Sequence, residues 1–236
     1  KLYYEIPKNQ LNKDFLMVVQ IAKGRLGTGN GGGDPIDERV VRWTLRDNKG
    51  LLVDVDYRAW ADPSLPIARA VAAANNPTYL AAFPLEAKGK NYIGAKALDK
   101  DRCFLENALA FPENIEVEST LTLMNPDRVM GWGGGKLSQG TASLRMRYSM
   151  VKLPDQPMMP RLQDSRVGYF AHGQRDFGRP EHYAKNRYYI ARWRLEKKDP
   201  NAPLSEPVKP IIFYIDPATP KAWVPYVKKG VEQWQV

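Results

Sequence analysis

The order of apolar and polar residues predicts strands over most of the first two thirds of the chain. Phe15–Ala22 is a continuous apolar run, as in a strand buried on both faces. Val40–Arg46 and Leu51–Tyr57 flank the turn-forming run Asp47–Gly50, which indicates a hairpin. In the second arm, apolar residues at positions 53, 55 and 57 alternate with aspartates at positions 54 and 56, which predicts one apolar and one acidic face.

A second hairpin is predicted from Ile115–Leu123 and Leu144–Met150, which both alternate and are joined by the glycine-rich stretch Asn125–Gly140. Eight residues should face inward: Ile115, Val117, Leu121, Leu123, Leu144, Met146, Tyr148 and Met150. Tyr188–Leu195 is another expected strand, with arginines on its solvent side. About seven or eight strands without a helix after each one favour an antiparallel sheet or sandwich.

Two helices are expected. Ser64 can cap a helix with Pro66 in its first turn and Pro77 after its end, and its alanines predict close packing on a sheet. The second helix should start near Trp223, because Pro225 has to lie in its first turn. Four large apolar residues share one face of it: Trp223, Val227, Val231 and Trp234.

The composition changes between Glu196 and Pro210, where four prolines and mixed charges indicate a linker or a long surface connection. A new strand, Ile211–Asp216, is expected after it. We therefore expect a β-rich domain over residues 1–209 and the start of a second domain over residues 210–236. The predicted fold class is α+β and β-rich, mainly antiparallel with one or two helices.

The composition is that of a soluble globular protein: 236 residues, 43% hydrophobic and 26% charged. No run reaches the roughly 18 apolar residues of a transmembrane helix, so no transmembrane segment is expected. The chain starts at Lys1 without a signal-like segment and stops at Val236 in mid-pattern. We expect it to be a piece of a longer polypeptide.

The net charge of +9 favours acidic partners in general. The basic residues are spread out, however, and pairs such as Arg145/Arg147 alternate like the solvent face of a strand. We therefore expect a solvated basic surface and no nucleic-acid partner.

Few residues suit metal or nucleophile chemistry. His172 and His182 could hold a metal with Asp176 and Glu181, but ten positions separate them in a Gly- and Pro-rich segment, so surface histidines are expected. Cys103 follows an arginine that could lower its thiol pKa, yet no histidine lies near it in sequence. The expected role of Cys103 is that of a small buried residue.

Two glycine-rich stretches, Gly24–Asp34 and Gly131–Gly135, resemble phosphate-binding loops only in composition. Neither is followed by the helix that such a loop opens, so both are expected to be flexible connections. No catalytic, cofactor-binding or metal-binding residue is expected in this chain.

A family resemblance adds to this picture. The run PIIFYIDPATPKAWVPYVKKGVEQWQV resembles the opening strand and helix of bacterial met-zincin-like zinc-dependent metallopeptidases. Earlier segments, among them DFLMVVQIAKG, FPENIEVESTLT, PMMPRLQDSRVGYF and RWRLEKKDP, are similar to the N-terminal domain of unknown function that precedes the protease in that family.

The resemblance implies a hydrolase whose zinc is held by an HExxH helix and whose base is the glutamate of that motif. No HExxH occurs in this chain, so the motif would lie beyond Val236 and zinc would belong to the parent protein. The implied partners are the protease domain of the same polypeptide and a protein or peptide substrate. The implied location is periplasmic, outer-membrane-associated or extracellular.

By resemblance, this region shapes the cleft or recruits substrates, helps the protease to fold, or covers the cleft as a pro-segment. The candidate interface residues are Arg161, Asp164, Arg166, Tyr169 and Phe170, together with the four-residue stripe of the C-terminal helix. The alternative is a free-standing basic binding module for carbohydrate or another envelope polymer. Its sign would be a shared platform of Trp43, Trp60, Trp132 or Trp193.

Overall fold

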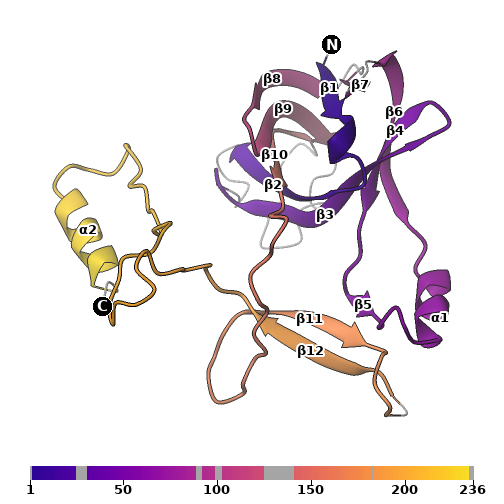
Figure 1. The fold of residues 1–236 in the computed structure, drawn as a ribbon. Coiled ribbons are helices and arrows are strands. Elements are labelled where there is room, and N and C mark those ends of the chain that lie inside the picture. The colour runs from indigo at the N-terminus through magenta and orange to yellow at the C-terminus, as the bar shows by residue number, and fades with distance from the viewer. Residues whose placement is uncertain are drawn as a thin grey trace. The chain divides into compact units, whose positions relative to one another are not determined.

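The computed structural model describes residues 2–24, 31–88, 92–98, 103–124, 141–181 and 183–233. In chain order the elements are β1 (Leu2–Pro7), η1 (Lys8–Gln10), β2 (Asp14–Lys23), β3 (Pro35–Arg46), β4 (Lys49–Asp54), β5 (Ala59–Trp60), α1 (Ile67–Ala74), β6 (Thr78–Lys88), β7 (Tyr92–Leu98), β8 (Cys103–Ala110), β9 (Asn114–Met124), β10 (Thr141–Lys152), β11 (Ala171–Asp176), β12 (Lys185–Ile190) and α2 (Val224–Glu232) (Figure 1). The chain divides into two compact units. Unit 1 is Lys1–Met159 with Gly173–Tyr188, and unit 2 is Pro160–His172 with Tyr189–Val236.

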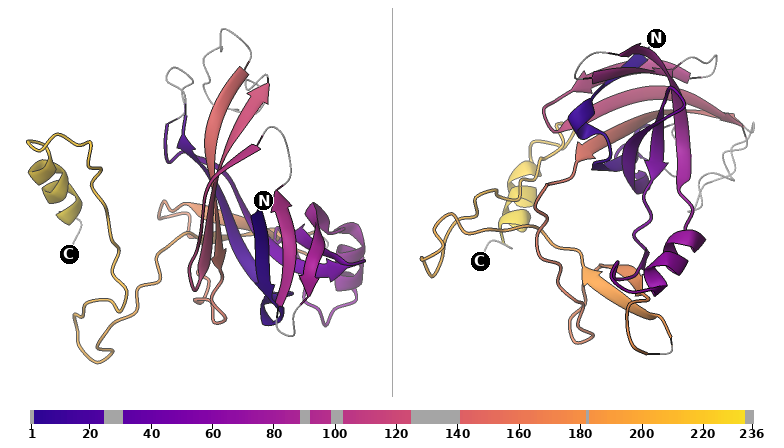
Figure 2. Two further views of the ribbon diagram at one scale, coloured as in Figure 1. Left: turned by 90° about the horizontal axis from the view of Figure 1, so that it is seen from above. Right: turned by 45° about the vertical axis from the view of Figure 1, so that its right-hand side comes forward.

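Nine strands form one curled antiparallel sheet in the order β1-β7-β6-β4-β3-β2-β10-β9-β8 (Figures 1 and 2). Strands β12, β11 and β5 form a separate small sheet in that order, and its β11–β5 pair is parallel. The β-rich α+β class with an antiparallel sheet is therefore confirmed.

The core of unit 1 lies against the curled sheet. One cluster gathers around Trp43, which is 3% exposed, and the ring of Trp43 lies 5.5 Å from that of Tyr4 and 5.4 Å from that of Phe83. A second cluster contains Val19, Ile21, Leu144 and Met146. Apolar burial of this kind is the main term that stabilises the sheet.

The hairpin of β9 and β10 is confirmed, with Tyr148 opposite Val117 and Met150 opposite Ile115. The inward residues are also confirmed where they are described. Val117, Leu144, Met146 and Met150 are buried, and Ile115, Leu121 and Tyr148 are half-buried. The side chain of Leu123 lies outside the described residues.

The hairpin of β3 and β4 is also confirmed, but its turn is tighter than expected. Only Asp47 and Asn48 turn the chain, with φ of +49° and +58°, while Lys49 already pairs with Arg46. Two residues with positive φ are typical of a type I′ turn, whose twist matches that of the flanking strands. The second arm, β4, ends at Asp54 rather than at position 57. Asp54 pairs with Thr78, the first residue of the neighbouring strand β6.

Other expectations at strand level need correction. Strand β2 is present, yet most of its side chains are half-buried rather than covered on both faces. Ile211–Asp216 is not a strand, and Ala191–Leu195 does not continue β12: among the described residues, neither segment pairs with a strand.

Both expected helices are present. Helix α2 starts at Val224 as predicted, with Pro225 in its first turn. Ser64 does not cap α1: its backbone N–H and hydroxyl both donate to Asp62 Oδ1, in a turn before the helix. The alanines of α1 are mostly exposed, so the expected close packing on a sheet is wrong. Among the described residues, neither helix has the length and apolar character needed to cross a membrane.

Candidate functional site

A groove of about 400 Å³ lies in unit 1, beside the small sheet of β5, β11 and β12. Its lining combines polar and apolar groups and consists of Asp56, Arg58, Ala59, Gly173, Gln174, Arg175, Phe177, Asn186 and Tyr188. The volume is within the range of roughly 300–1,000 Å³ of sites that hold small ligands. This groove is the candidate functional site.

Strand alternation brings side chains from two strands to the groove. Successive side chains point to opposite faces of a sheet, so Gly173 and Arg175 share one face of β11, and Asn186 and Tyr188 share one face of β12. The ring of Tyr188 lies over Gly173, since a Cβ on that glycine would stand only 3.1 Å from Tyr188 Cε1. The absence of a side chain at Gly173 thus makes room for an aromatic surface in the groove.

The opposite face of the same strands carries a buried carboxylate. Asp176 is 1% exposed, and its Oδ2 lies 2.7 Å from Arg187 Nη2 and 3.5 Å from Arg179 Nε. The backbone N–H of Gly178 donates to Asp176 Oδ1 at 2.9 Å. These contacts tie β11 to β12 and to the loop after β11, and so hold the groove residues in place.

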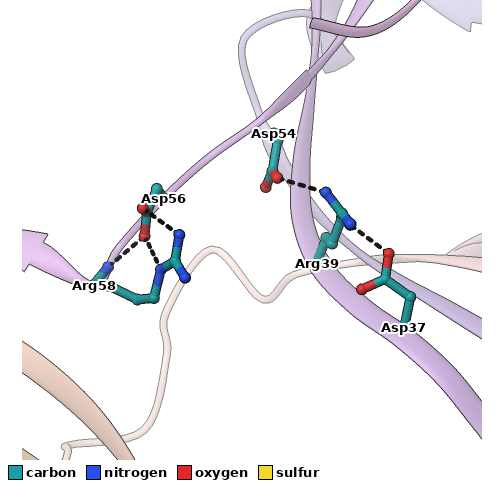
Figure 3. Close-up of polar contacts among 5 residues, drawn as sticks. All are labelled: Asp37, Arg39, Asp54, Asp56 and Arg58. Atoms are coloured by element: carbon teal, nitrogen blue, oxygen red, sulfur yellow. Dashed lines mark hydrogen bonds and ion pairs between the residues drawn. The ribbon is translucent and has the colours of Figure 1, made fainter. Parts of the chain in front are cut away.

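The N-terminal wall of the groove is fixed by an ion pair. Arg58 donates from Nε to Asp56 Oδ1 at 2.9 Å and from Nη2 to Oδ2 at 2.8 Å, a two-bonded fork that Figure 3 shows. Hydrogen bonds from the Arg58 side chain lower the pKa of Asp56. The pair neutralises both charges, so Arg58 does not add a free positive charge to the groove.

A second acid–arginine set lies nearby on β3 and β4. Arg39 contacts Asp37 on its own strand and donates from Nη1 to Asp54 Oδ2 at 3.0 Å (Figure 3). The three aspartates drawn there are all held by arginines, which leaves none of them as an obvious ligand for a cation.

Asp14 links three segments of unit 1. It accepts hydrogen bonds from Arg42 Nε at 2.6 Å and from the hydroxyl of Tyr57. Burial acts to raise the pKa of Asp14, but the hydrogen bonds from Arg42 and Tyr57 outweigh it and lower this pKa. Burial and the bond to Asp14 raise the pKa of Tyr57, so the hydroxyl stays a donor at neutral pH.

The metal site considered from the sequence does not form among the described residues. Asp176 is held by arginines, and Glu181 Oε1 lies 3.7 Å from Arg179 Nη1. His172 is exposed on β11. His182 lies outside the described residues. In the part of the chain that the structure describes, no three His, Cys, Asp or Glu residues are grouped as a metal would require.

The other residues singled out from the sequence contribute little. Cys103 opens β8, but its side chain lies outside the described residues, as does the stretch Gly131–Gly135. In the first glycine-rich stretch, Gly31 N–H donates to Asp34 Oδ2 at 2.7 Å and Gly33 has φ of +96°, in a turn that leads into β3. That turn is not the start of a helix, in agreement with a connecting role.

The candidate interface residues lie in unit 2. All five candidates before β11 are exposed, and Phe170 is 93% exposed: Arg161, Asp164, Arg166, Tyr169 and Phe170. Arg166 donates to both carboxylate oxygens of Asp164, at 2.9 and 2.6 Å. On α2, Val227 and Val231 are exposed, as is Trp223 at its N-cap, while Trp234 lies outside the described residues. Hydrogen bonding thus links Arg166 and Asp164, and the interface role of the whole set stays a prediction.

A shared tryptophan platform would be the sign of the alternative, a carbohydrate-binding module. Trp43 is a core residue, and Trp132 lies outside the described residues. Trp60 and Trp193 belong to different units. Trp43 is buried because VVRWTLR places it on the inner face of β3, where its ring packs against Tyr4 and Phe83.

Comparisons with known proteins give two matches. Residues 89–198 match the family model described as Domain of unknown function (DUF5117), and residues 1–24 match that described as Domain of unknown function (DUF5118). No curated protein and no solved structure matches the chain. Strands β11 and β12, which carry most of the groove, fall inside the first match, whereas Asp56–Ala59 falls outside both.

Sequence reasoning missed most of the groove. The segment AHGQRD belongs to the Gly- and Pro-rich stretch between the two histidines, where the sequence predicts no strand, yet it forms β11. No alternation of apolar and polar residues marks this segment as a strand. Its pairing is shown only by the structure, in which β12 lies beside it.

Proposed function

We propose that this chain is the non-catalytic N-terminal accessory, or pro-segment-like, region of a zinc-dependent metalloprotease. An HExxH domain beyond Val236 would hydrolyse the peptide bond and hold the zinc. Two lines support the proposal: the resemblance to the N-terminal region of met-zincin-like metallopeptidases, and matches to two domains of unknown function over residues 1–24 and 89–198.

One structural observation carries the proposal: unit 2 exposes many large apolar side chains. They are Leu162, Val167, Tyr169, Phe170, Trp193, Leu195, Leu204, Val208, Ile212, Phe213, Tyr214, Trp223, Tyr226, Val227 and Val231. None of the described residues of unit 2 is buried. Exposed apolar surface on this scale is typical of a region that docks on another protein surface.

Helix α2 has exposed apolar side chains that need a second protein surface to bury them. A nine-residue helix is marginal in water by itself, and each large apolar side chain gains roughly 1.5–3 kcal/mol only when it is covered. Trp223 and Tyr226 contact each other at 6.0 Å between ring centroids, but both stay exposed. In the proposed protein, the protease domain of the same polypeptide supplies the cover, and peptides or proteins are its substrates.

The test compares this chain with the natural polypeptide that contains it. Zinc content and casein hydrolysis are measured for both. We expect one zinc per molecule and chelator-sensitive hydrolysis from the natural polypeptide, and neither from residues 1–236. One tightly bound zinc in the chain 1–236, with proteolysis abolished by a chelator, would overturn the proposal, as would a natural polypeptide without peptidase activity.

A pair of substitutions in the natural polypeptide tests the interface. Phe170→Asp should lower peptidase activity or the thermal midpoint, because a charge enters a covered apolar contact. Phe104→Asp is the matched control, since Phe104 is 63% exposed on β8 in unit 1 and has no assigned role in docking. Equal effects of the two changes would contradict an interface at Phe170.

A further inference from the structure

The groove beside β11 and β12 contains one positive charge that no described lining residue compensates. Arg175 lines the groove and its side chain is exposed. Within the described residues the Arg175 guanidinium has no hydrogen bond or ion pair, and only its backbone N–H is engaged, with Arg58 O at 2.7 Å. Arg58 and Asp56 neutralise each other, so the three charged groups of the lining leave a net charge of +1.

A guanidinium that is free of partners and has one open side selects planar anions, because its N–H groups match a carboxylate in a two-bonded fork. Asn186 lines the same groove with an amide that can donate to such a group and accept from a backbone N–H. The carboxylate of an incoming ligand would therefore meet Arg175 and Asn186.

The lining of the groove also contains the aromatic rings of Tyr188 and Phe177. The ring of Tyr188 lies over Gly173 and is 47% exposed, and Phe177 adds a second half-buried ring to the lining. A ring that is already held against the sheet offers apolar contact area at a small entropic cost. The ligand should therefore carry an apolar group close to its carboxylate.

We propose that this groove binds an acidic segment of a polypeptide, with a glutamate or aspartate side chain on Arg175 and Asn186 and a neighbouring apolar side chain on Tyr188. Recruitment of an acidic peptide substrate to the protease rests on the proposed function, and the net charge of +9 assists the approach of such a segment. An acidic sugar would use the same guanidinium. The peptide is favoured because the single exposed ring of Tyr188 suits one apolar side chain better than a run of sugar rings.

Fluorescence anisotropy with the chain 1–236 tests the proposal directly. The probe is a fluorescein-labelled peptide of sequence Gly-Phe-Glu-Phe-Glu-Gly, and a second probe has glutamine in place of both glutamates. We expect the acidic probe to bind and its affinity to fall as salt is added, and we expect the glutamine probe to bind at least about tenfold more weakly.

Three variants locate the site. Arg175→Gln should weaken binding of the acidic probe about tenfold, and Arg175→Lys should restore part of the affinity by keeping the charge without the planar fork. Gly173→Ala should weaken it a few-fold by pushing the Tyr188 ring. Arg69→Gln is the matched control. Arg69 is exposed on α1, its guanidinium makes no hydrogen bond or ion pair with described residues, and its backbone bond to Pro66 O is unaffected by the change, which removes the same charge.

Equal affinity of the Arg175→Gln and Arg69→Gln variants would overturn the proposal, since only overall charge would then matter. Absence of binding by the acidic probe would also overturn it. Trigalacturonate serves as competitor: tighter binding of this sugar than of the peptide, lost in Arg175→Gln, would assign the groove to acidic sugars instead. Hydrolysis of an uncharged peptide by the natural polypeptide is measured separately, so a failure of the groove and a failure of the protease assignment are distinguishable.

Discussion

Unit 1 and unit 2 have similar supplies of large apolar residues but use them differently. In unit 1 these residues meet against the curled sheet, and every buried hydrophobic residue in the described part of the chain belongs to this unit. In unit 2, aromatic residues such as Phe213, Tyr214 and Trp193 remain in solvent. Apolar content therefore does not decide which region builds a core.

Backbone pairing accounts for the difference. Strand β3 pairs with β2 on one side and β4 on the other, which fixes Val41 and Trp43 on the inner face. The segment Ile211–Asp216 is also rich in large apolar residues, but it pairs with no strand among the described residues. Unit 2 instead forms local contacts, such as the loop closed by Lys198 N–H to Glu206 O at 2.9 Å and Val208 N–H to Glu196 O at 2.8 Å. The comparison can be tested by matched changes in the two units.

The largest effect is expected from tryptophan truncation. Trp43→Ala should lower the free energy of unfolding by about 3–5 kcal/mol, because it leaves a cavity among Tyr4, Phe83 and Met150. Trp193→Ala, in unit 2, should change it by less than about 0.5 kcal/mol, since Trp193 is 65% exposed. Urea denaturation of both variants measures the two values, and similar losses would contradict the division between units.

A smaller effect is expected from Asp176→Asn. The change leaves Arg187 and Arg179 without their carboxylate, and we expect a loss of about 2–3 kcal/mol. The control is Asp164→Asn in unit 2, where the carboxylate is exposed and bonds only within its own loop. No measurable change is expected there. A loss in the control as large as in Asp176→Asn would show that burial is not the cause.

The third prediction concerns acid stability. The lowered pKa of Asp14 means that the folded chain keeps this group ionised to a lower pH than the unfolded chain, in which an aspartate titrates near about 3.9. Its contribution is therefore fully present above about pH 5 and is lost as the pH falls through the folded pKa. Asp14→Asn should flatten the dependence of the urea midpoint on pH below about 4. An unchanged slope would assign the acid sensitivity to other groups.

The smallest effect on stability is expected from removal of residues 210–236. These residues contribute no buried side chain among those described, so a chain that ends at Lys209 should melt within about 2 °C of the intact chain. It should also be more soluble, because Phe213, Tyr214 and Trp223 are removed. A large drop in the melting temperature would place the C-terminal helix in the core of unit 1.

The sequence predicted the parts of the fold in which one residue pattern sufficed. Alternation identified β9 and β10, and the position of Pro225 identified the start of α2 to within one residue. Sequence patterns failed where the presence of a neighbouring strand decides whether a segment becomes a strand. The apolar run Ile211–Asp216 predicts a strand, but it pairs with no strand among the described residues. The segment AHGQRD has no strand pattern, yet it pairs with β12 and β5. The groove was missed for the same reason, since Arg175 and Tyr188 come from strands that the sequence does not place side by side.

By itself the sequence determined the β-rich class, the inner face of the β9–β10 hairpin and the position of the last helix. These features depend on side-chain periodicity and on proline geometry, which are local properties. Only the tertiary structure decided that Trp43 is a core residue, that Asp176 is held by two arginines, and that Arg175 lies in one groove with Tyr188 and has no side-chain partner among the described residues. Those outcomes depend on which strands lie together, because burial and charge pairing are properties of neighbours in space rather than of positions in the chain.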